Sequence, residues 1–297
     1  MSLQTLPRLR SPGAELLLLL VAIFWGTSYG LTQSALALTS VLMFIAIRFL
    51  LTHLLLLPVM VHEFSQGKNR DWRSALPTGL ILLIIFSCEV LGVAHTSAAN
   101  AAFLISLNVL MTPFMEMAVH RKPLDSQMLL LAVLSATGVY ALTRKNGITW
   151  QLNAGDLLIL AAAAMRALMV TMTKRLTAGK QLSMLSLTAI QSLIVGGGAL
   201  IIAMFTAPLT LPVSQTFWLI VMYLVVFCTL FAFFAQNLAV QQTSATRVAL
   251  LMGSEPLFGA LFAVVWMHEH LTLMQAFGGL LILVSTAVSL LPKRTLT

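Results

Sequence analysis

The chain has 297 residues, of which 59% are hydrophobic and only 9% charged, and its formal net charge is +8. This composition excludes a soluble protein of such length, because a water-facing surface requires many more polar residues. Whatever the protein does must therefore happen in a membrane.

Ten apolar runs of roughly 20 residues follow one another, and each is long enough to cross a hydrocarbon core as a helix. They cover about 14–33, 41–62, 74–95, 98–119, 126–143, 154–173, 183–205, 216–238, 244–266 and 272–291. The first run follows Arg8 and Arg10, as the core of a signal peptide would. Its length and the similar runs after it favour an uncleaved first helix. The sequence predicts an all-α integral membrane protein.

Basic residues are distributed unevenly over the predicted loops. With the N-terminus inside, the cytoplasmic side receives twelve of the 17 Lys and Arg residues, and the opposite side only Arg144 and Lys145. This bias predicts that both termini are cytoplasmic. It also accounts for the positive net charge without a nucleic-acid partner. Cys88 and Cys228 fall within spans, which favours buried thiols over a disulfide.

The first half of the chain, 1–147, repeats weakly in the second half, 148–297. Thr96-Ser97-Ala98 recurs 147 residues later as Thr243-Ser244-Ala245. At the same offset polar residues match polar residues, in the pairs Glu89 with Gln236, Asn100 with Arg247, and Asn108 with Glu255. Each half holds five spans, an odd number, so the second must lie upside down. The sequence predicts ten transmembrane helices as two inverted five-helix repeats, the pattern of transporters that bind substrate near the midplane.

Glu255 stands directly before Pro256 in the middle of a long apolar run. A charge near the bilayer centre is costly and by default indicates a functional site. Pro256 removes a backbone hydrogen bond and clashes with the carbonyl of Met252, so we expect the helix to break here. The carboxylate could bind a substrate, carry a proton, or satisfy backbone groups freed by the proline, and the sequence leaves these roles open.

Two further pairs of charges are predicted from depth, at about 1.5 Å per helical residue. Arg166 falls near the level of Glu255, where a lone charge needs a partner, a substrate or water. Arg48 and Glu89 both lie roughly 10 Å below the outer surface. The sequence therefore predicts a structural ion pair between Arg48 and Glu89, with a substrate contact as the alternative.

Other polar residues in the spans admit two interpretations. Asn100, Asn108 and Gln236 could bond a substrate or join helices, and Trp25 could line a cavity or pack in the core. Arg247 and Glu116 lie about one turn inside the cytoplasmic face, which favours side chains that reach back to water.

One apparent catalytic motif does not fit its surroundings. Gly26-Thr27-Ser28-Tyr29-Gly30 matches G-x-S-x-G, but it lies inside a membrane helix rather than on a strand-turn-helix. Small residues that allow close helix approach explain it better.

Several motifs resemble the EamA-type branch of the drug/metabolite transporter superfamily. They are Phe24-Trp25-Gly26-Thr27-Ser28, Arg48-Phe49, the runs 92–113 and 235–262, and His268-Glu269-His270-Leu271. The similarity covers essentially the whole chain and implies a ten-span, exporter-like carrier of amino acids, other metabolites or drugs. The chain departs from the family pattern in three places. Arg121-Lys122 replaces an acidic residue, Arg166 a frequent tryptophan, and Glu89 a frequent glutamine.

The expected function is secondary transport by alternating access across a bacterial inner membrane, in the direction of export. No nucleotide-binding motif is seen, so a proton gradient, a counter-substrate or the substrate's own gradient would drive it. We expect a small amphipathic substrate, such as a zwitterion with an apolar side chain, and neither cofactor nor metal. The predicted substrate-binding residues are Trp25, Asn100, Asn108, Arg166, Gln236 and Glu255.

The alternative is a non-transporting membrane protein, either an intramembrane enzyme or a sensor. An enzyme would need a nucleophile and a base at one depth. The histidines within spans are His53 and His95, and the sequence indicates no such pair at the depth of either. The sequence leaves open whether the chain is a monomer or a homodimer.

Overall fold

The computed structural model describes residues 12–96, 98–121, 123–143, 153–206, 211–267 and 272–291, and the regular structure within these ranges is helical. The first half contains α1 (Pro12–Leu36), α2 (Val41–Ser65), the 3₁₀ turn η1 (Trp72–Ser74), α3 (Ala75–His95), α4 (Ala98–Ser106), α5 (Asn108–His120) and α6 (Ser126–Thr143). The second half contains α7 (Ala154–Thr177), α8 (Met184–Thr206), α9 (Gln215–Val225), the π-helical turn η2 (Val226–Phe231), α10 (Ala232–Gln242), α11 (Ala245–Met252), α12 (Glu255–Met267) and α13 (Leu273–Leu290).

The helices match the predicted membrane crossings. Within the described ranges, eight helical stretches are long and apolar enough to span a bilayer, and α6 is a shorter apolar helix. The remaining predicted span, 244–266, is present as α11 and α12 with a break between them. Large apolar side chains such as Leu16, Leu54 and Phe205 are exposed. Lipid rather than water surrounds such a bundle, so these outward faces are stable.

Side-chain caps fix several helix starts near the predicted loops. Asn153 and Asp156 form a capping box at the start of α7, and Thr272 and Gln275 form another at the start of α13. These caps satisfy backbone N–H groups that the first turn of a helix leaves without partners. The boundaries therefore follow from local sequence.

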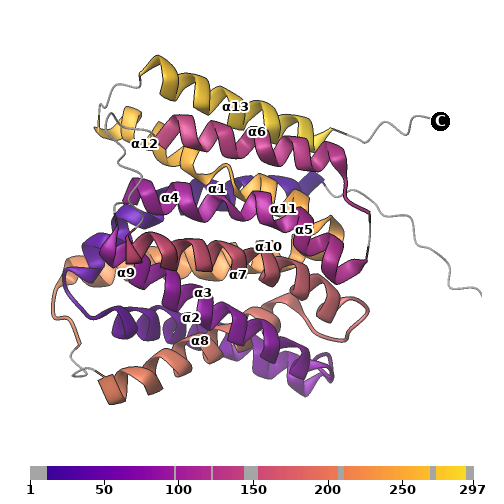
Figure 1. The fold of residues 1–297 in the computed structure, drawn as a ribbon. Helices are drawn as coiled ribbons and strands as arrows, with labels where there is room; N and C mark the ends of the chain where they lie inside the picture. Colours follow the sequence, from indigo (N-terminus) through magenta and orange to yellow (C-terminus); the bar gives the residue numbers. More distant parts are fainter. Residues whose placement is uncertain are drawn as a thin grey trace, which may run out of the picture.

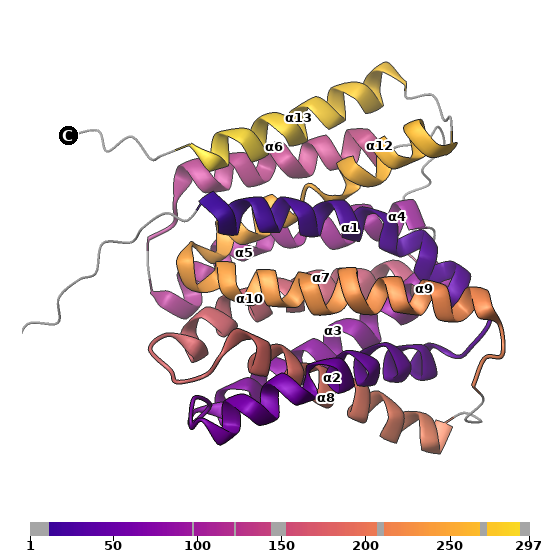
Figure 2. The same ribbon diagram turned by 180° about the vertical axis from the view of Figure 1, so that it is seen from behind.

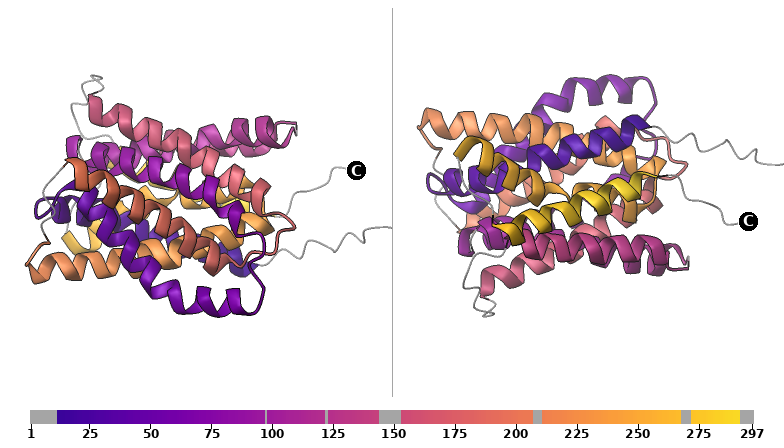
Figure 3. Two further views of the ribbon diagram at one scale, coloured as in Figure 1. Left: turned by 90° about the horizontal axis from the view of Figure 1, so that it is seen from below. Right: turned by 90° about the horizontal axis from the view of Figure 1, so that it is seen from above.

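The helices run roughly side by side in a stack (Figure 1). The pair α6 and α13 lies at one end of the stack and the pair α2 and α8 at the other, as the view from behind also shows (Figure 2). Seen from above, the yellow α13 lies across the near face of the bundle (Figure 3). Helices α1, α5, α7, α10 and α11 occupy the middle of the stack, and α12 lies beside α6.

The main helix contacts join one half of the chain to the other. Helix α2 packs on α8, α3 on α7, α6 on α13, α5 on α7, and α1 on α12. The two predicted units, 1–147 and 148–297, are thus interleaved in space. A cavity enclosed by this bundle must be shared by both halves.

Both ends of the described chain meet at one end of the bundle. The start of α1 and the end of α13 lie on the same side in Figures 1 and 2. Arg247, at the start of α11, joins them: its Nη1 lies 3.2 Å from Glu15 Oε1, and its Nε donates to Ser289 O at 2.6 Å. We call this the termini end of the bundle.

The prediction that Arg247 reaches back to water is wrong. Arg247 is only 7% exposed and bonds protein groups. Glu116 accepts hydrogen bonds from the N–H and hydroxyl of Thr246 at 2.9 and 2.7 Å. Neighbouring helix ends offer Arg247 partners at shorter range than the water outside. Glu116 is half-buried, so for this side chain contact with water stays a prediction.

Candidate functional site

Glu255 is the first residue of a helix in the interior of the bundle. Helix α11 ends at Met252, Gly253 and Ser254 form a turn, and α12 begins at Glu255. Pro256 therefore occupies the first turn of α12, where its missing N–H costs no hydrogen bond. The interruption lies where the sequence predicts it, but Pro256 begins a new helix instead of distorting a continuous one. Glu255 is 2% exposed.

A second interruption, at the related position of the first half, faces the first. Leu107 separates α4 from α5, and Asn108 is the first residue of α5. The two breaks are in contact, because a Cβ added to Gly253 would lie 2.3 Å from Val109 Cγ2. Only glycine fits at this point. The two interrupted helices thus bring Asn108 and Glu255 into one region of the interior.

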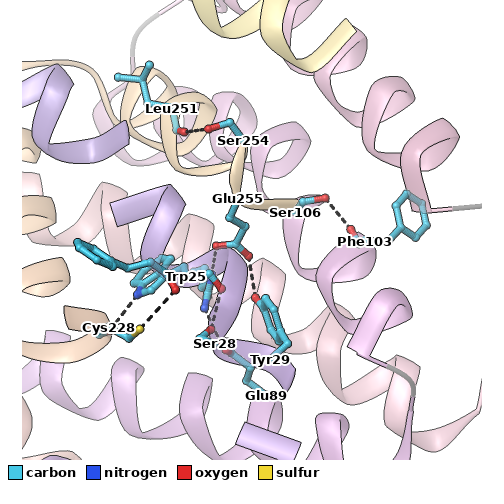
Figure 4. Close-up of polar contacts among 12 residues, drawn as sticks. Trp25, Ser28, Tyr29, Glu89, Phe103, Ser106, Cys228, Leu251, Ser254 and Glu255 are labelled. Atoms are coloured by element: carbon cyan, nitrogen blue, oxygen red, sulfur yellow. Dashed lines mark hydrogen bonds and ion pairs between the residues drawn. The ribbon is translucent and has the colours of Figure 1, made fainter. Parts of the chain in front are cut away.

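Helix α1 supplies a hydrogen-bond donor to Glu255. It crosses α12 so closely that a Cβ on Gly26 would lie 2.7 Å from both Glu255 O and Gly259 N. One turn further, Tyr29 Oη donates to Glu255 Oε1 at 2.7 Å (Figure 4). Within the G-x-S-x-G match, Gly26 thus allows α1 to approach α12 closely. Gly30 makes no such contact, since nothing lies within 4 Å of a Cβ placed there.

Arg166 of α7 lies between two carboxylates. Its Nη2 donates to Glu89 Oε2 of α3 at 2.8 Å, and its Nη1 lies 4.0 Å from Glu255 Oε2, beyond hydrogen-bonding distance. The guanidinium also lies 4.7 Å from the centre of the Trp25 ring, a cation–π contact. Arg166 is therefore paired with Glu89 and only near Glu255.

The predicted ion pair between Arg48 and Glu89 is wrong, because Arg48 bonds a different element. Its Nε donates to Thr229 Oγ1 at 2.7 Å and its Nη2 to Cys228 O at 3.2 Å, both in the π-helical turn η2. The Cys228 carbonyl accepts more than one side-chain hydrogen bond. Trp25 Nε1 donates to the same carbonyl at 2.9 Å.

A small buried cavity lies beside these charges. Its free volume, counted as the positions open to the centre of a water molecule, is about 30 Å³, which is room for roughly two waters. Apolar side chains form much of its wall, with Leu82, Ile85, Phe86, Met169, Val170 and Phe233 among them. The polar lining residues are Ser106, Asn108, Thr112, Arg166, Gln236 and Glu255, together with Trp25.

Five of the six predicted substrate-binding residues line this one cavity: Trp25, Asn108, Arg166, Gln236 and Glu255. The side chain of the sixth, Asn100, lies outside the described residues, as does the His268-Glu269-His270 motif. Two buried lining oxygens, Asn108 Oδ1 and Glu255 Oε2, have no hydrogen-bond partner. The cavity therefore offers acceptors that its own walls leave unsatisfied.

Sequence reasoning missed Tyr29 as a member of this site. Tyr29 is four residues after Trp25, and residues at i and i+4 share one helix face. This spacing from Trp25 could have identified Tyr29 as a cavity residue. Ser106 and Thr112 were also missed, because short hydroxyl side chains in apolar helices usually bond their own backbone, as both do here.

These observations define a multi-pass helical membrane protein in which two broken helices meet at a buried polar cavity. The model of the EamA-like transporter family matches residues 13–144 and 153–291. The chain belongs to this family and is a membrane transporter, with a small-molecule substrate and a lipid surround.

Individual proteins support the same assignment. An uncharacterized transporter of Archaeoglobus fulgidus is 26% identical over 275 residues, which are 93% of this chain and 85% of that protein. One of Methanothermobacter thermautotrophicus is 27% identical over 224 residues, or 74% of this chain and 64% of that protein. A crystal structure with 16% identity superposes with a TM-score of 0.77 over 94% of this chain and 97% of its own. That last likeness concerns the fold alone.

Proposed function

We propose that this protein is a secondary transporter that exports a small amphipathic metabolite across a bacterial inner membrane by alternating access. The observation that carries the proposal is the meeting of two interrupted helices, one from each half, at a cavity lined by Asn108, Arg166 and Glu255. Helix interruptions are tolerated at membrane depth where they are buried in protein or line a cavity, and transporters place their substrate sites there.

The division of space around Arg166 supports alternating access. A second small cavity is lined by Ser28, Tyr29, Thr32, Glu89, Val90 and Val93. Trp25, Phe86 and Arg166 line both cavities, so they form a partition between them. In this conformation the first cavity is too small for a metabolite. The partition and the surrounding helices must move to admit one, and such movement gives access from one side at a time.

Flux through purified protein in proteoliposomes tests the proposal. We expect saturable uptake of at least one solute from a panel of radiolabelled apolar amino acids and arylalkylamines, measured with and without an imposed proton gradient. Glu255→Gln should reduce the rate at least about tenfold if the carboxylate binds the substrate or a coupled proton, since a charged hydrogen bond contributes about 1.5–3 kcal/mol.

Two outcomes would count against the proposal. Absence of saturable flux for the whole panel, with the protein still folded, would reject transport of this substrate class. Unchanged flux and unchanged pH dependence in Glu255→Gln would reduce this carboxylate to a structural role.

A further inference from the structure

Two residues that line the cavity each carry a buried hydrogen-bond acceptor without a partner. Glu255 is 2% exposed, and its Oε2 has no hydrogen-bond partner, although its other oxygen accepts from Tyr29. Asn108 Oδ1 is also buried without a donor. Both side chains line the same cavity. Buried acceptors left without a donor are costly, so a ligand that donates hydrogen bonds would be favoured here.

The charges around the cavity are unbalanced by one. The ionisable groups that face Glu255 are Tyr29 on α1, Glu89 on α3 and Arg166 on α7. Arg166 bonds Glu89 at 2.8 Å and lies 4.0 Å from Glu255 Oε2, so one guanidinium is shared by two carboxylates and the three groups carry one excess negative charge. The other nearby cation, Arg48, is bonded to Thr229 and the Cys228 carbonyl. Among the described residues around the cavity one positive charge is missing, and a second anion would find no unpaired cation there.

We infer that the transported substrate is a primary amine without a carboxylate, whose ammonium group binds between Glu255 and Asn108. An ammonium group supplies the missing charge and several N–H donors, which matches two unsatisfied acceptors. The apolar wall, with Phe86 and Phe233, fits an apolar or aromatic remainder. This inference rests on the proposed transport function and replaces the zwitterion expected from the sequence. A zwitterion's carboxylate would have to displace Glu89 from Arg166.

The available space agrees with this placement of the head group. The present free volume of about 30 Å³ accepts a group of the size of one or two waters. An ammonium group is of that size, whereas a phenyl ring is not. The head group thus fits the closed cavity, and the remainder requires the wider cavity of an open state.

Binding to matched ligands tests the inference independently of transport. Isothermal titration calorimetry on the purified full chain in nanodiscs at pH 7.5 would compare phenethylamine, phenylalanine methyl ester, phenylalanine and 3-phenylpropanoate. We expect the first two to bind at least about tenfold more tightly than phenylalanine, because phenylalanine, unlike these two amines, brings an uncompensated carboxylate to the site. The carboxylate-only ligand should not bind.

Variants locate the amine. Glu255→Gln should weaken phenethylamine binding about tenfold to a hundredfold, the range expected for a lost charge-assisted hydrogen bond. Asn108→Ala should weaken it less. Glu63→Gln removes one carboxylate charge at the far end of α2, away from the cavity, and should leave binding unchanged. Circular dichroism and thermal unfolding of each variant establish that it is folded.

The results separate this inference from the proposed function. Equal or tighter binding of phenylalanine, no binding of either amine, or amine binding unaffected by Glu255→Gln would each overturn the amine assignment. If phenylalanine were then transported in the proteoliposome experiment, the transporter proposal would stand without it. Tighter amine binding that depends on Glu255 supports the assignment whatever the flux.

Discussion

Arg166 shows how a single buried charge is made tolerable in a membrane. It bonds Glu89 at 2.8 Å and lies over the Trp25 ring at 4.7 Å. A buried ion pair contributes little net stability compared with an apolar pair, but removal of one partner leaves a charge that burial makes expensive. We therefore expect stability to fall when one partner is replaced and to fall less when both partners are replaced.

A double-mutant cycle measures this sensitivity. Arg166→Gln leaves Glu89 and Glu255 without their cation and should lower the free energy of unfolding by about 3–5 kcal/mol. The double variant Glu89→Gln with Arg166→Gln should recover at least about 1 kcal/mol of that loss. Reversible unfolding in mixed micelles, with helicity as the readout, gives the four free energies.

The comparison pair for this cycle is Arg48 with Glu89. Because Arg48 bonds η2 instead, its coupling energy to Glu89 should be smaller than that between Arg166 and Glu89. A larger coupling for Arg48 would restore the pairing predicted from the sequence and contradict the observed one.

The direction in which helical side chains lean explains why the sequence pointed to the wrong cation. Spacing gives the depth of each Cα, but side chains tilt toward the N-terminus of their helix. Helices α2 and α7 start at the end of the bundle opposite the termini, and α3 starts at the termini end. The Cα atoms of Arg166 on α7 and Glu89 on α3 lie at different depths, and their side chains lean toward each other. The Cα atoms of Arg48 on α2 and Glu89 lie at the same depth, and their side chains lean apart.

At the scale of helices, the site depends on one close crossing. Gly26 and Gly259 let α1 and α12 touch backbone to backbone, and this contact sets Tyr29 against Glu255. The sequence indicated close helix approach in 26–30, but it did not show which glycine makes the contact. That depends on the rotation of α1 about its axis, which tertiary packing decides.

Matched substitutions of two glycines in α1 test this crossing. Gly26→Val should destabilise the protein by about 1–3 kcal/mol or more through overpacking against rigid backbone. Gly30→Ala is the control: nothing lies within 4 Å of the added Cβ, and alanine should gain up to about 1 kcal/mol as the better helix former. Thermal unfolding in detergent compares the two. Equal effects would mean that the crossing does not limit stability.

The interrupted helices support the interpretation of the chain as two inverted repeats. Asn108 begins α5 and Glu255 begins α12, as their matched positions in the two halves require. The contacts α1 with α12 and α7 with α5 are related in the same way. The spans and the break before Glu255 could be predicted, because length, hydropathy and proline act locally. The break at Leu107 was not predicted, because no proline marks it. The partners of each polar side chain could not, because they belong to helices distant in sequence.

At the scale of the whole molecule, the positive charges gather at the termini end. Lys174 bonds the Thr243 carbonyl, Arg175 bonds Val119 O at 3.5 Å, and Lys180 lies 4.0 Å from Asp71. These contacts join loops and helix ends on the side where α1 starts and α13 ends. Cationic loops are retained in the cytoplasm, so we propose that the termini end is cytoplasmic.

Cysteine accessibility tests this orientation with one site at each end. Val213, in the segment before α9, is 97% exposed, and the Lys180 side chain is 48% exposed. In right-side-out spheroplasts a membrane-impermeant maleimide should label Val213→Cys and not Lys180→Cys. In inverted vesicles the labelling should be reversed. The parent chain, whose Cys228 is buried and Cys88 half-buried, measures the background.

The orientation matters for mechanism because it places the cavity lined by Asn108 and Thr112 on the cytoplasmic side of the Arg166 partition, where an exporter would load its substrate. Labelling of Lys180→Cys from outside would invert both the topology and the inferred direction of loading.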